Sequence, residues 1–450
     1  MPPHPIEVEW DPDLRAGNPL TWPGYEPPAQ ESVITGRTAH YAFAEGRFDI
    51  LGGSMGTAHG EKVVRAYRRA VEARLPMLLL PASGGARMQE GMVSLIQMAR
   101  TSTAATAHSA AGLLSLAVLR SPTTGGVYAS YASLADLRAA ERGATIGFAG
   151  PRVVELTTGS PLPEGSHTAA AAFEHGLVDA VLDDGTAWVD GALGLVDVPL
   201  HPRRFGGIFG ETSFADDAWG EVQRARLPFR ASGVDWAARL CSSWTDLRGP
   251  DPVVRAGLAT FEGRRVVVVA MDRHAASGRP RPAGFRLAQR AIGLAGRLGL
   301  PLVTLVDTPG ADPGADSEAD GIAAEIARTF AAMSSLPSVS VSVCVGEGGS
   351  GGALALAHAD RLLIQEHAIF SVIAPEGAAA ILERDASKAP DLAARLKLTS
   401  ADLLELGIVD GVVAEPHPEE LRKALLAALD EVLPGQRERR VDAASARWLR

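Results

Sequence analysis

Lysine and cysteine are scarce in this chain of 450 residues. Lysine occurs at four positions, and the two cysteines, Cys241 and Cys344, lie far apart in apolar surroundings. Two separated cysteines exclude a disulfide framework and a thiolate metal site, and they favour a reducing compartment. No group of His, Asp and Glu has the spacing of a metal site, so we expect no bound metal.

Long apolar runs and clusters of positive charge are also missing. No uncharged apolar stretch approaches the 18 residues of a membrane span, and the Pro-rich, acidic beginning of the chain does not resemble a signal peptide. Acidic residues outnumber basic ones by 53 to 43, giving a net charge of −10, and the basic residues are scattered. We therefore expect no membrane or nucleic-acid partner and a cytoplasmic location.

Short apolar runs bounded by Gly or Pro alternate with helical patterns along the chain. Three of the runs, Met77 to Pro81, Leu302 to Val306 and Val339 to Val345, have the length and composition of buried parallel strands. The helical patterns cover Glu61 to Arg74, Gly91 to Ala107, Ala283 to Leu298 and Gly321 to Met333. This alternation predicts an α/β fold made of βαβ units.

The chain contains an internal repeat. PASGGAR, beginning at Pro81, has a counterpart in DTPGADP, beginning at Asp307, and PTTGGVYAS has one in GGSGGALAL, which pairs Gly126 with Gly352. EHGLVDAV near the end of the first half answers ELGIVDGV near the end of the second. Because order and spacing are kept, we predict two copies of one fold joined near Pro199 to Gly207, not a solenoid of short repeats.

Each half carries two glycine-rich turns between a strand and a helix. They contain Gly84, Gly85 and Gly125, Gly126 in the first half, and Gly310 and Gly351, Gly352 with Ala353 in the second. Such turns present free backbone N–H groups that can hold a phosphate or a developing oxyanion. For a single turn, tight strand-to-helix packing is an equally good explanation, but matching pairs favour function.

Two motifs that suggest other chemistry are discounted. Gly52 to Gly56 and Gly348 to Gly352 both fit the G-x-S-x-G pattern of serine hydrolases, which needs an acid and then a His far downstream. His358 and His367 follow Ser350 closely, and only His417 lies late in the chain, so we discount this interpretation. Asp307 to Gly310 is similar to a GTPase segment, yet no phosphate-binding loop with a Gly-Lys pair exists.

Several cations lie beside the turns, where a polyanion such as CoA would need them. They are Arg87, Lys62, Arg279 and Arg281. A solvated helix face is the alternative for each of them.

Gly52 to Asp184 closely resembles the β subunit of bacterial acetyl-CoA carboxylase carboxyltransferase, through GGSMGTAHGEKVVRA, ASGGARMQEGMVSLIQMARTS and PTTGGVYASYASLAD. From Ala218 to about Pro416 the chain resembles the α subunit, through LVTLVDTPGADPG, GEGGSGGALALAHADR and LKLTSADLLELGIVD. The resemblance implies two tandem crotonase-like domains. Residues 1–203 would form the β-like, acyl-CoA-binding domain, and residues 204–450 the α-like, carboxybiotin-binding domain.

The resemblance also implies roles for the turns. The amides of Gly125 and Gly126 would polarise the acyl-CoA carbonyl, and those of Gly352 and Ala353, with Gly351 shaping the turn, would polarise the ureido carbonyl of biotin. These residues form the catalytic set. Gly84, Gly85 and Arg87 would line the CoA channel, and Gly310 the biotin side.

No biotinyl segment and no ATP-binding carboxylase domain is recognisable in the sequence. The resemblance therefore implies a biotin carboxyl carrier protein and a biotin carboxylase as partners, and a homo-oligomer of at least two chains. Acetyl-CoA is the most natural acceptor, which would place the product in fatty acid or polyketide precursor synthesis. The four-cysteine zinc ribbon of the β subunit is missing, so no zinc is expected, and Asp312 replaces an aromatic residue after TPGA.

Three alternatives stay open. A malonyl-thioester decarboxylase of the same superfamily would need no biotin. An enoyl-CoA hydratase or isomerase would need a placed Glu near the first turns, which the first half does not obviously offer. A non-catalytic assembly subunit would bind CoA without turnover.

Overall fold

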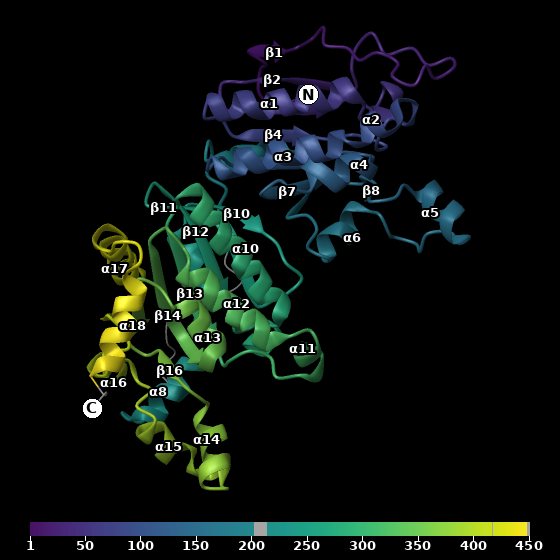
Figure 1. Cartoon of the computed structure of the whole chain (residues 1–450). Helices are drawn as coiled ribbons and strands as arrows, with labels where there is room; N and C mark the ends of the chain where they lie inside the picture. Colours follow the sequence, from purple (N-terminus) through teal and green to yellow (C-terminus); the bar gives the residue numbers. More distant parts are fainter. Residues whose placement is uncertain (202–213, 416, 448–450) are drawn as a thin grey trace. The chain divides into compact units, whose positions relative to one another are not determined.

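The computed structural model describes residues 1–201, 214–415 and 417–447. The chain divides into two compact units, Met1–Val189 and Asp190–Arg450 (Figure 1). The expected join at Pro199 to Gly207 lies mostly outside the described residues. No helix in the described part of the chain is both long and apolar enough to cross a bilayer.

The first unit is built on a seven-stranded sheet in the order β1-β2-β3-β4-β5-β7-β9. The first three strands are antiparallel and those that follow are parallel. The strands are β1 (Val8–Trp10), β2 (Val33–Arg37), β3 (Ala42–Gly46), β4 (Met77–Leu80), β5 (Ser115–Leu119), β7 (Leu137–Glu141) and β9 (Ala180–Leu182), with a small separate pair of β6 (Thr123–Thr124) and β8 (Ile146–Gly147).

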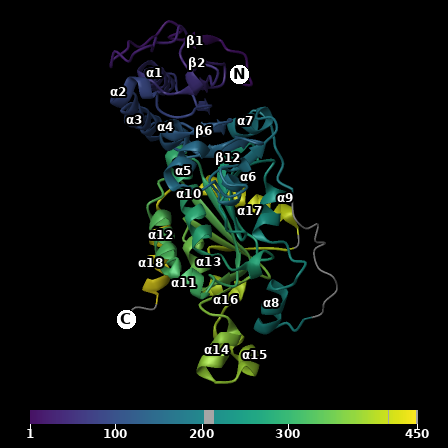
Figure 2. The same ribbon diagram turned by 90° about the vertical axis from the view of Figure 1, so that its right-hand side faces the viewer.

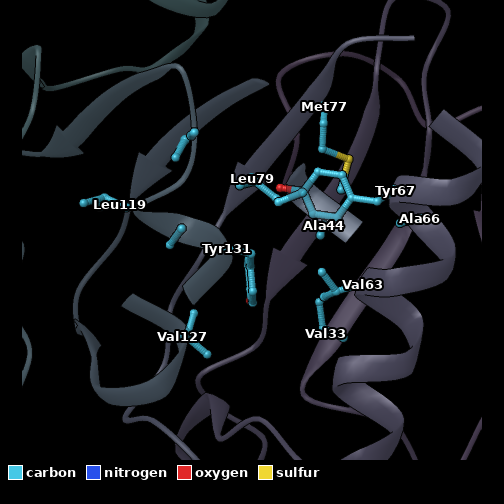
Figure 3. Close-up of a cluster of buried hydrophobic side chains, with 14 of the residues drawn as sticks. Val33, Ala44, Val63, Ala66, Tyr67, Met77, Leu79, Leu119, Val127 and Tyr131 are labelled. Atoms are coloured by element: carbon cyan, nitrogen blue, oxygen red, sulfur yellow. The ribbon is translucent and has the colours of Figure 1, made fainter. Parts of the chain in front are cut away.

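Helices α1 (Thr57–Glu72) and α3 (Gln97–Ala110) pack against each other, and α1 also packs on β2 and β3. Aliphatic and aromatic side chains from this helix layer and the sheet form the core, part of which Figure 3 shows around Tyr67, Met77 and Tyr131. The other helices of the unit are α2 (Gly91–Leu95), α4 (Gly125–Val127), α5 (Pro151–Thr158) and α6 (Ala169–Glu174), and α7 (Thr186–Leu193) contains the division between the units.

The second unit repeats this plan with longer strands. Its sheet runs β10-β11-β12-β13-β14-β15-β17, again antiparallel at the start and parallel afterwards, and β16 pairs with β14. The strands are β10 (Ser243–Leu247), β11 (Val254–Phe261), β12 (Arg264–Met271), β13 (Leu302–Thr308), β14 (Ser340–Gly349), β15 (Arg361–Gln365), β16 (Ile369–Ser371) and β17 (Gly411–Val413).

Helices cover both faces of this sheet (Figure 2). Helices α10 (Pro282–Leu298), α12 (Ile322–Ser334) and α13 (Ser350–Ala357) pack on one face, and α9 (Gly233–Leu240) and α17 (Pro418–Glu431) on the other. The remaining helices are α8 (Ala218–Ala225), α11 (Ala315–Ala319), α14 (Pro375–Leu382), α15 (Ala389–Arg395), α16 (Ser400–Glu405) and α18 (Gln436–Ala446). Such a mixed α/β architecture agrees with the sequence prediction.

The repeat is visible in hydrogen bonds as well as in sequence. In the first unit, Asp136 accepts hydrogen bonds from the N–H and the hydroxyl of Ser115, both at 2.9 Å. In the second unit, Asp360 accepts the same two bonds from Ser340, at 2.9 and 2.8 Å. Each pair ties the start of a parallel strand to the loop before the next one, so both copies use the same buried clamp.

Candidate functional site

In the first unit, two glycine-rich turns lie against each other after β4 and β5. Ser83 pairs with Thr123, and a Cβ atom on Gly125 would lie 2.7 Å from the Cα of Gly85. Gly85 and Gly125 have φ values of +120° and +60°, in the left-handed region that favours glycine. Glycine is therefore required here both by close packing and by backbone conformation.

The hydrogen bonds of these turns leave particular amides available. The Gly85 N–H donates to the Ser83 hydroxyl at 3.0 Å, and the Arg87 N–H donates to the Met55 carbonyl at 3.0 Å. The Ala86 N–H, between them, has no acceptor within the described part of the chain. Gly126 is the second residue of α4, where an amide has no partner inside the helix, and a Cβ placed on it would lie 3.7 Å from the Ala86 nitrogen. The amides of Ala86 and Gly126 thus lie at the contact between the two turns.

The Gly125 amide is engaged elsewhere, because its N–H donates to the Phe148 carbonyl at 2.8 Å. The sequence prediction gave Gly125 and Gly126 the same task. In the structure Gly125 shapes the turn, and the amide that lies beside Gly126 without an acceptor in the described residues is that of Ala86. Ala86 was missed by the sequence analysis, although the repeat aligns it with Ala311.

The second unit repeats this arrangement after β13 and β14. The Gly310 N–H donates to the Thr308 hydroxyl at 3.1 Å and the Asp312 N–H to the Pro280 carbonyl at 3.0 Å, again leaving the alanine amide between them, Ala311, without an acceptor in the described residues. A Cβ atom on Gly352 would lie 2.8 Å from the Ala311 nitrogen.

Around Gly351, in the first turn of α13, a Cβ atom would meet no heavy atom within 4 Å, so this side of the turn is open. The amides of Gly351 and Gly352 belong to that first turn, where no intrahelical acceptor exists. Ala353 is the fourth residue of the helix, so its N–H has an intrahelical acceptor in the carbonyl of Gly349, the residue that caps α13.

Strand pairing shifts the alignment of the two halves by one residue. Thr123 pairs with Ser83 in the first unit, and Gly348 pairs with Thr308 in the second, which makes Gly126 equivalent to Gly351. The sequence comparison paired Gly126 with Gly352. The left-handed residue of the second turn is Ser350, with φ of +55°, at the place of Gly125.

Arg87 lies in the interior of the first unit. Its side chain is fully buried and pairs with Glu31 and with Glu90, whose Oε1 lies 3.0 Å from Nη1. The guanidinium also donates to the Ser54 carbonyl at 2.9 Å. Burial lowers the pKa of Arg87, but the bonds to Glu31 outweigh this effect and raise it. These contacts tie the turn after β4 to the segment before β2. The charge of Arg87, which the sequence analysis assigned to the CoA channel, is therefore paired in the interior of the unit.

The other three predicted cations differ in how far solvent reaches their side chains. Lys62 is buried, its Nζ donates to the Val33 carbonyl at 3.3 Å, and burial lowers its pKa. Arg279 is half-buried, and Arg281 is exposed with its Nε 3.6 Å from Asp312. The candidates nearest to a glycine turn and open to solvent are thus Arg279 and Arg281 in the second unit.

A buried histidine belongs to the same polar cluster as Arg87. The Nδ1 atom of His59 lies 2.8 Å from the Ser32 hydroxyl, and its Nε2 atom lies 3.2 Å from the Tyr131 hydroxyl. Burial lowers the pKa of His59 to about 4, against the attraction of Glu31. His59 is therefore neutral in the folded protein at neutral pH.

This histidine predicts a loss of stability in weak acid. The unfolded chain takes up a proton near pH 6.5 whereas the folded state resists until about pH 4, so stability is complete above 6.5 and falls as pH drops. Between pH 7.5 and 5.0 the loss is about 2 kcal/mol from this group. Urea unfolding at both values measures it. His59→Gln should remove that part of the pH dependence, and an unchanged dependence in the variant would contradict the assignment.

In the second unit, ion pairs join the ends of the strands that carry the turns. Arg226 forms a bidentate pair with Glu347 in β14, with a shortest distance of 2.7 Å, and bonds Glu376 of α14 at 2.6 Å. Arg273 lies 3.3 Å from Asp307 in β13. The Glu347 N–H donates to the same Asp307 carboxylate at 3.0 Å. This network fixes the spacing of β13 and β14 just before their turns.

We expect Arg226→Met to lower the catalytic rate by more than Glu376→Gln does. Arg226→Met leaves Glu347 buried without its bidentate partner and loosens β14. Glu376→Gln removes only the bond between Arg226 and α14, and the carboxylate of Glu376 is partly exposed. Steady-state kcat and KM for both variants measure this. Equal losses would indicate that α14, and not the strand end, is what Arg226 positions.

Comparison with known proteins agrees with this duplicated geometry. The carboxyl transferase domain model matches residues 31–190, and the model described as acetyl co-enzyme A carboxylase carboxyltransferase-like matches residues 212–437. The acetyl-coenzyme A carboxylase carboxyl transferase subunits beta/alpha of Salinispora arenicola are 44% identical over 90% of this chain and 78% of that protein. The chain belongs to the acetyl-CoA carboxylase carboxyltransferase family.

Other members and structures extend this picture. A probable biotin-dependent acyl-coenzyme A carboxylase beta3 subunit of Mycobacterium bovis is 40% identical over 89% of this chain and 83% of that protein. The crystal structure of transcarboxylase 12S superposes with a TM-score of 0.77 at 24% identity, covering 92% of this chain and 86% of that one.

This likeness confirms the predicted crotonase-like fold. As a member of the family, the chain is a carboxyltransferase component of a biotin-dependent acyl-CoA carboxylase, acting on a CoA thioester.

Proposed function

We propose that the first unit binds the acyl-CoA with its thioester carbonyl oxygen between the amides of Ala86 and Gly126. When the α-carbon loses a proton, negative charge develops on that oxygen. Two fixed N–H donors stabilise this charge without having to reorganise. The observation that carries the proposal is that two amides without acceptors in the described residues, those of Ala86 and Gly126, lie where a pair of glycine turns meet. Gly84, Gly85 and Gly125 keep side chains out of this space.

The second unit is proposed to hold carboxybiotin in the equivalent place, with the ureido oxygen near the amides of Ala311, Gly351 and Gly352. Ala353, which the sequence placed in this set, follows them in α13 and has its amide directed to the helix. The open space around Gly351 and the side-chain-free turn at Gly310 fit a planar, uncharged ring with one carbonyl oxygen. When bound, the cofactor supplies the carboxyl group and a nitrogen base for the α-proton. The amides hold the charge on the ureido oxygen.

Acetyl-CoA is the acceptor that we propose, with malonyl-CoA as the product for fatty acid or polyketide precursor synthesis. The support is the name of the relatives at 39% to 44% identity, acetyl-coenzyme A carboxylase carboxyl transferase subunits beta/alpha. Biotin would arrive on a separate carrier protein charged by a separate biotin carboxylase. No zinc is needed in this scheme.

We propose further that the protein works as a homo-oligomer in which the first unit of one copy faces the second unit of another. Both units expose large apolar side chains at equivalent places. Phe148 and Leu156 at α5 are 70% and 87% exposed, and Val372 and Ile381 at α14 are 72% and 69% exposed. Such exposed apolar residues are typical of surfaces that another chain covers. Light scattering of the purified protein tests this, and a monomer would contradict it.

Carboxyl exchange tests the reaction and the acceptor together. The purified protein is incubated with free biotin and either malonyl-CoA or methylmalonyl-CoA, and loss of the carboxyl group is followed. Biotin-dependent turnover with malonyl-CoA favoured supports the proposal, and preference for methylmalonyl-CoA would overturn the acetyl assignment. Turnover without biotin would make the chain a decarboxylase.

A further inference from the structure

A cavity of about 520 Å³ lies on the second unit beside α18, the last helix of the described chain. One face of α18 forms one wall, and the end of α16, the loop after it and the start of β15 form the others. No residue of the glycine turns lines it. The cavity is therefore separate from the candidate carboxyltransferase site.

The sequence of α18 explains why this face is hollow. Residues 436, 439, 440, 443, 444 and 447 line the cavity, at the spacing of a single helix face. Ala443 and Ala444 occupy its middle, and Arg439 and Arg447 stand on either side of them. Two small side chains between long ones leave a space with an apolar floor, which Leu404 and Val409 continue on the facing wall.

The charge around this space is positive although the whole chain carries a net charge of −10. The lining contains four arginines, Arg361, Arg439, Arg440 and Arg447, and two aspartates. Asp360 is already neutralised, because Arg437 pairs with it at 2.9 Å in the interior. Asp410 accepts the Leu362 N–H at 2.7 Å and lies 3.8 Å from Arg440.

Two of these arginines are only weakly compensated by acidic residues, since Asp410 comes no nearer than 3.8 Å to Arg440. The side chain of Arg440 is 10% exposed, and its guanidinium is fixed by donating to the carbonyls of Ala359 at 3.2 Å and Ile408 at 2.8 Å. Burial lowers the pKa of Arg440 more than the attraction of Asp410 raises it. Arg439 is exposed and has no ion pair with any residue that the structure describes. A bound anion would compensate both charges.

We propose that this cavity binds a small phosphate ester with a compact apolar body. Guanidinium groups present several N–H donors in a planar fork that matches phosphate oxygens, and the strength of such bonds exceeds that of neutral ones. A volume of this size lies within the range of small-molecule sites, roughly 300 to 1,000 Å³. A free nucleotide and the phosphate groups of a CoA molecule share this chemistry.

Calorimetric titration of the full-length protein tests the site, with AMP as the probe and adenosine as the matched molecule without phosphate. We expect AMP to bind with a dissociation constant below about 1 mM and adenosine not to bind. Arg439→Ala should weaken AMP binding about tenfold, since it removes one charge-assisted contact. Arg328→Ala, which removes an exposed arginine from α12, is the control and should leave binding unchanged.

A second variant separates this pocket from general attraction of anions. Ala444→Leu keeps every charge but fills the hollow face of α18, and we expect it to abolish AMP binding. The proposal is wrong if Arg439→Ala and Ala444→Leu bind AMP as tightly as the unchanged protein does. It is also wrong if the unchanged protein binds AMP with a dissociation constant above about 10 mM. Adding CoA as a competitor shows which phosphate-containing molecule the pocket binds. Displacement of AMP by CoA assigns the pocket to CoA phosphates, and lack of displacement assigns it to a free phosphate ester.

Discussion

Replacing Gly352 with valine should lower kcat for biotin-dependent carboxyl exchange by about 10²-fold or more. The first side-chain carbon would lie 2.8 Å from the Ala311 nitrogen and 3.1 Å from its Cβ, so the turn after β13 must move or its amide must be covered. Either change would remove a fixed donor from the position proposed for the ureido oxygen. The loss should appear in kcat more than in KM, because the contact strengthens as charge develops.

The first unit offers a second test of the same kind. In Gly126→Val the new side chain would meet the Met98 sulfur at 3.2 Å and approach the Ala86 nitrogen, where the thioester oxygen is proposed to bind. Gly293→Ala in α10 is a control, since its Cβ would meet no atom closer than 3.7 Å. Thermal unfolding checks that each variant is folded. Carboxyl exchange at the normal rate in both valine variants would remove these glycines from the mechanism.

The second large effect concerns stability. Arg87→Met should destabilise the first unit by about 3 to 5 kcal/mol, because Glu31 and Glu90 would keep buried negative charge without the guanidinium between them. Adding Glu31→Gln to this variant should restore part of the loss by removing one of the two charges. Hydrogen exchange of peptides between residues 31 and 95 measures the effect locally, which matters in a chain of two units.

A role of Arg87 in CoA binding gives a different result. In that case Arg87→Lys would raise KM for the acyl-CoA and leave hydrogen exchange of the first unit unchanged. The buried network predicts an unchanged KM and faster hydrogen exchange in the first unit. Lysine cannot reproduce the bonds to Glu31, Glu90 and the Ser54 carbonyl at once. Measuring KM and exchange on the same preparation decides between the two.

Much of the fold could be predicted from local sequence. The run from Met77 became β4, the pattern from Ala283 became α10, and the run from Leu302 became β13, extended to Thr308. The stretch from Gly91 to Ala107 was expected as one helix but forms α2 and α3 in succession. These elements are specified by apolar periodicity and by Gly and Pro at their ends, which a sequence displays directly.

The details of the site were harder to predict because they depend on contacts between distant residues. Glu31 and Arg87 are 56 positions apart, and nothing near Arg87 in the sequence shows that its charge is used in the interior. Which amide lacks an acceptor depends on carbonyls such as those of Met55 and Pro280. Strand pairing shifts the alignment of the two halves by one residue, so that Gly126 corresponds to Gly351. The similar sequences of the two motifs suggested Gly352 instead.

The donors proposed for both carbonyl oxygens are main-chain amides, and this affects how the protein can be studied and how it can diverge. Ala86 and Ala311 are already alanine, so a scan that replaces side chains by alanine would pass over both of them without effect. Groups that add bulk, or that exchange an amide for an ester, are needed to reveal them. For the same reason, substitutions at neighbouring positions can reshape what the two turns accept while the donors themselves persist.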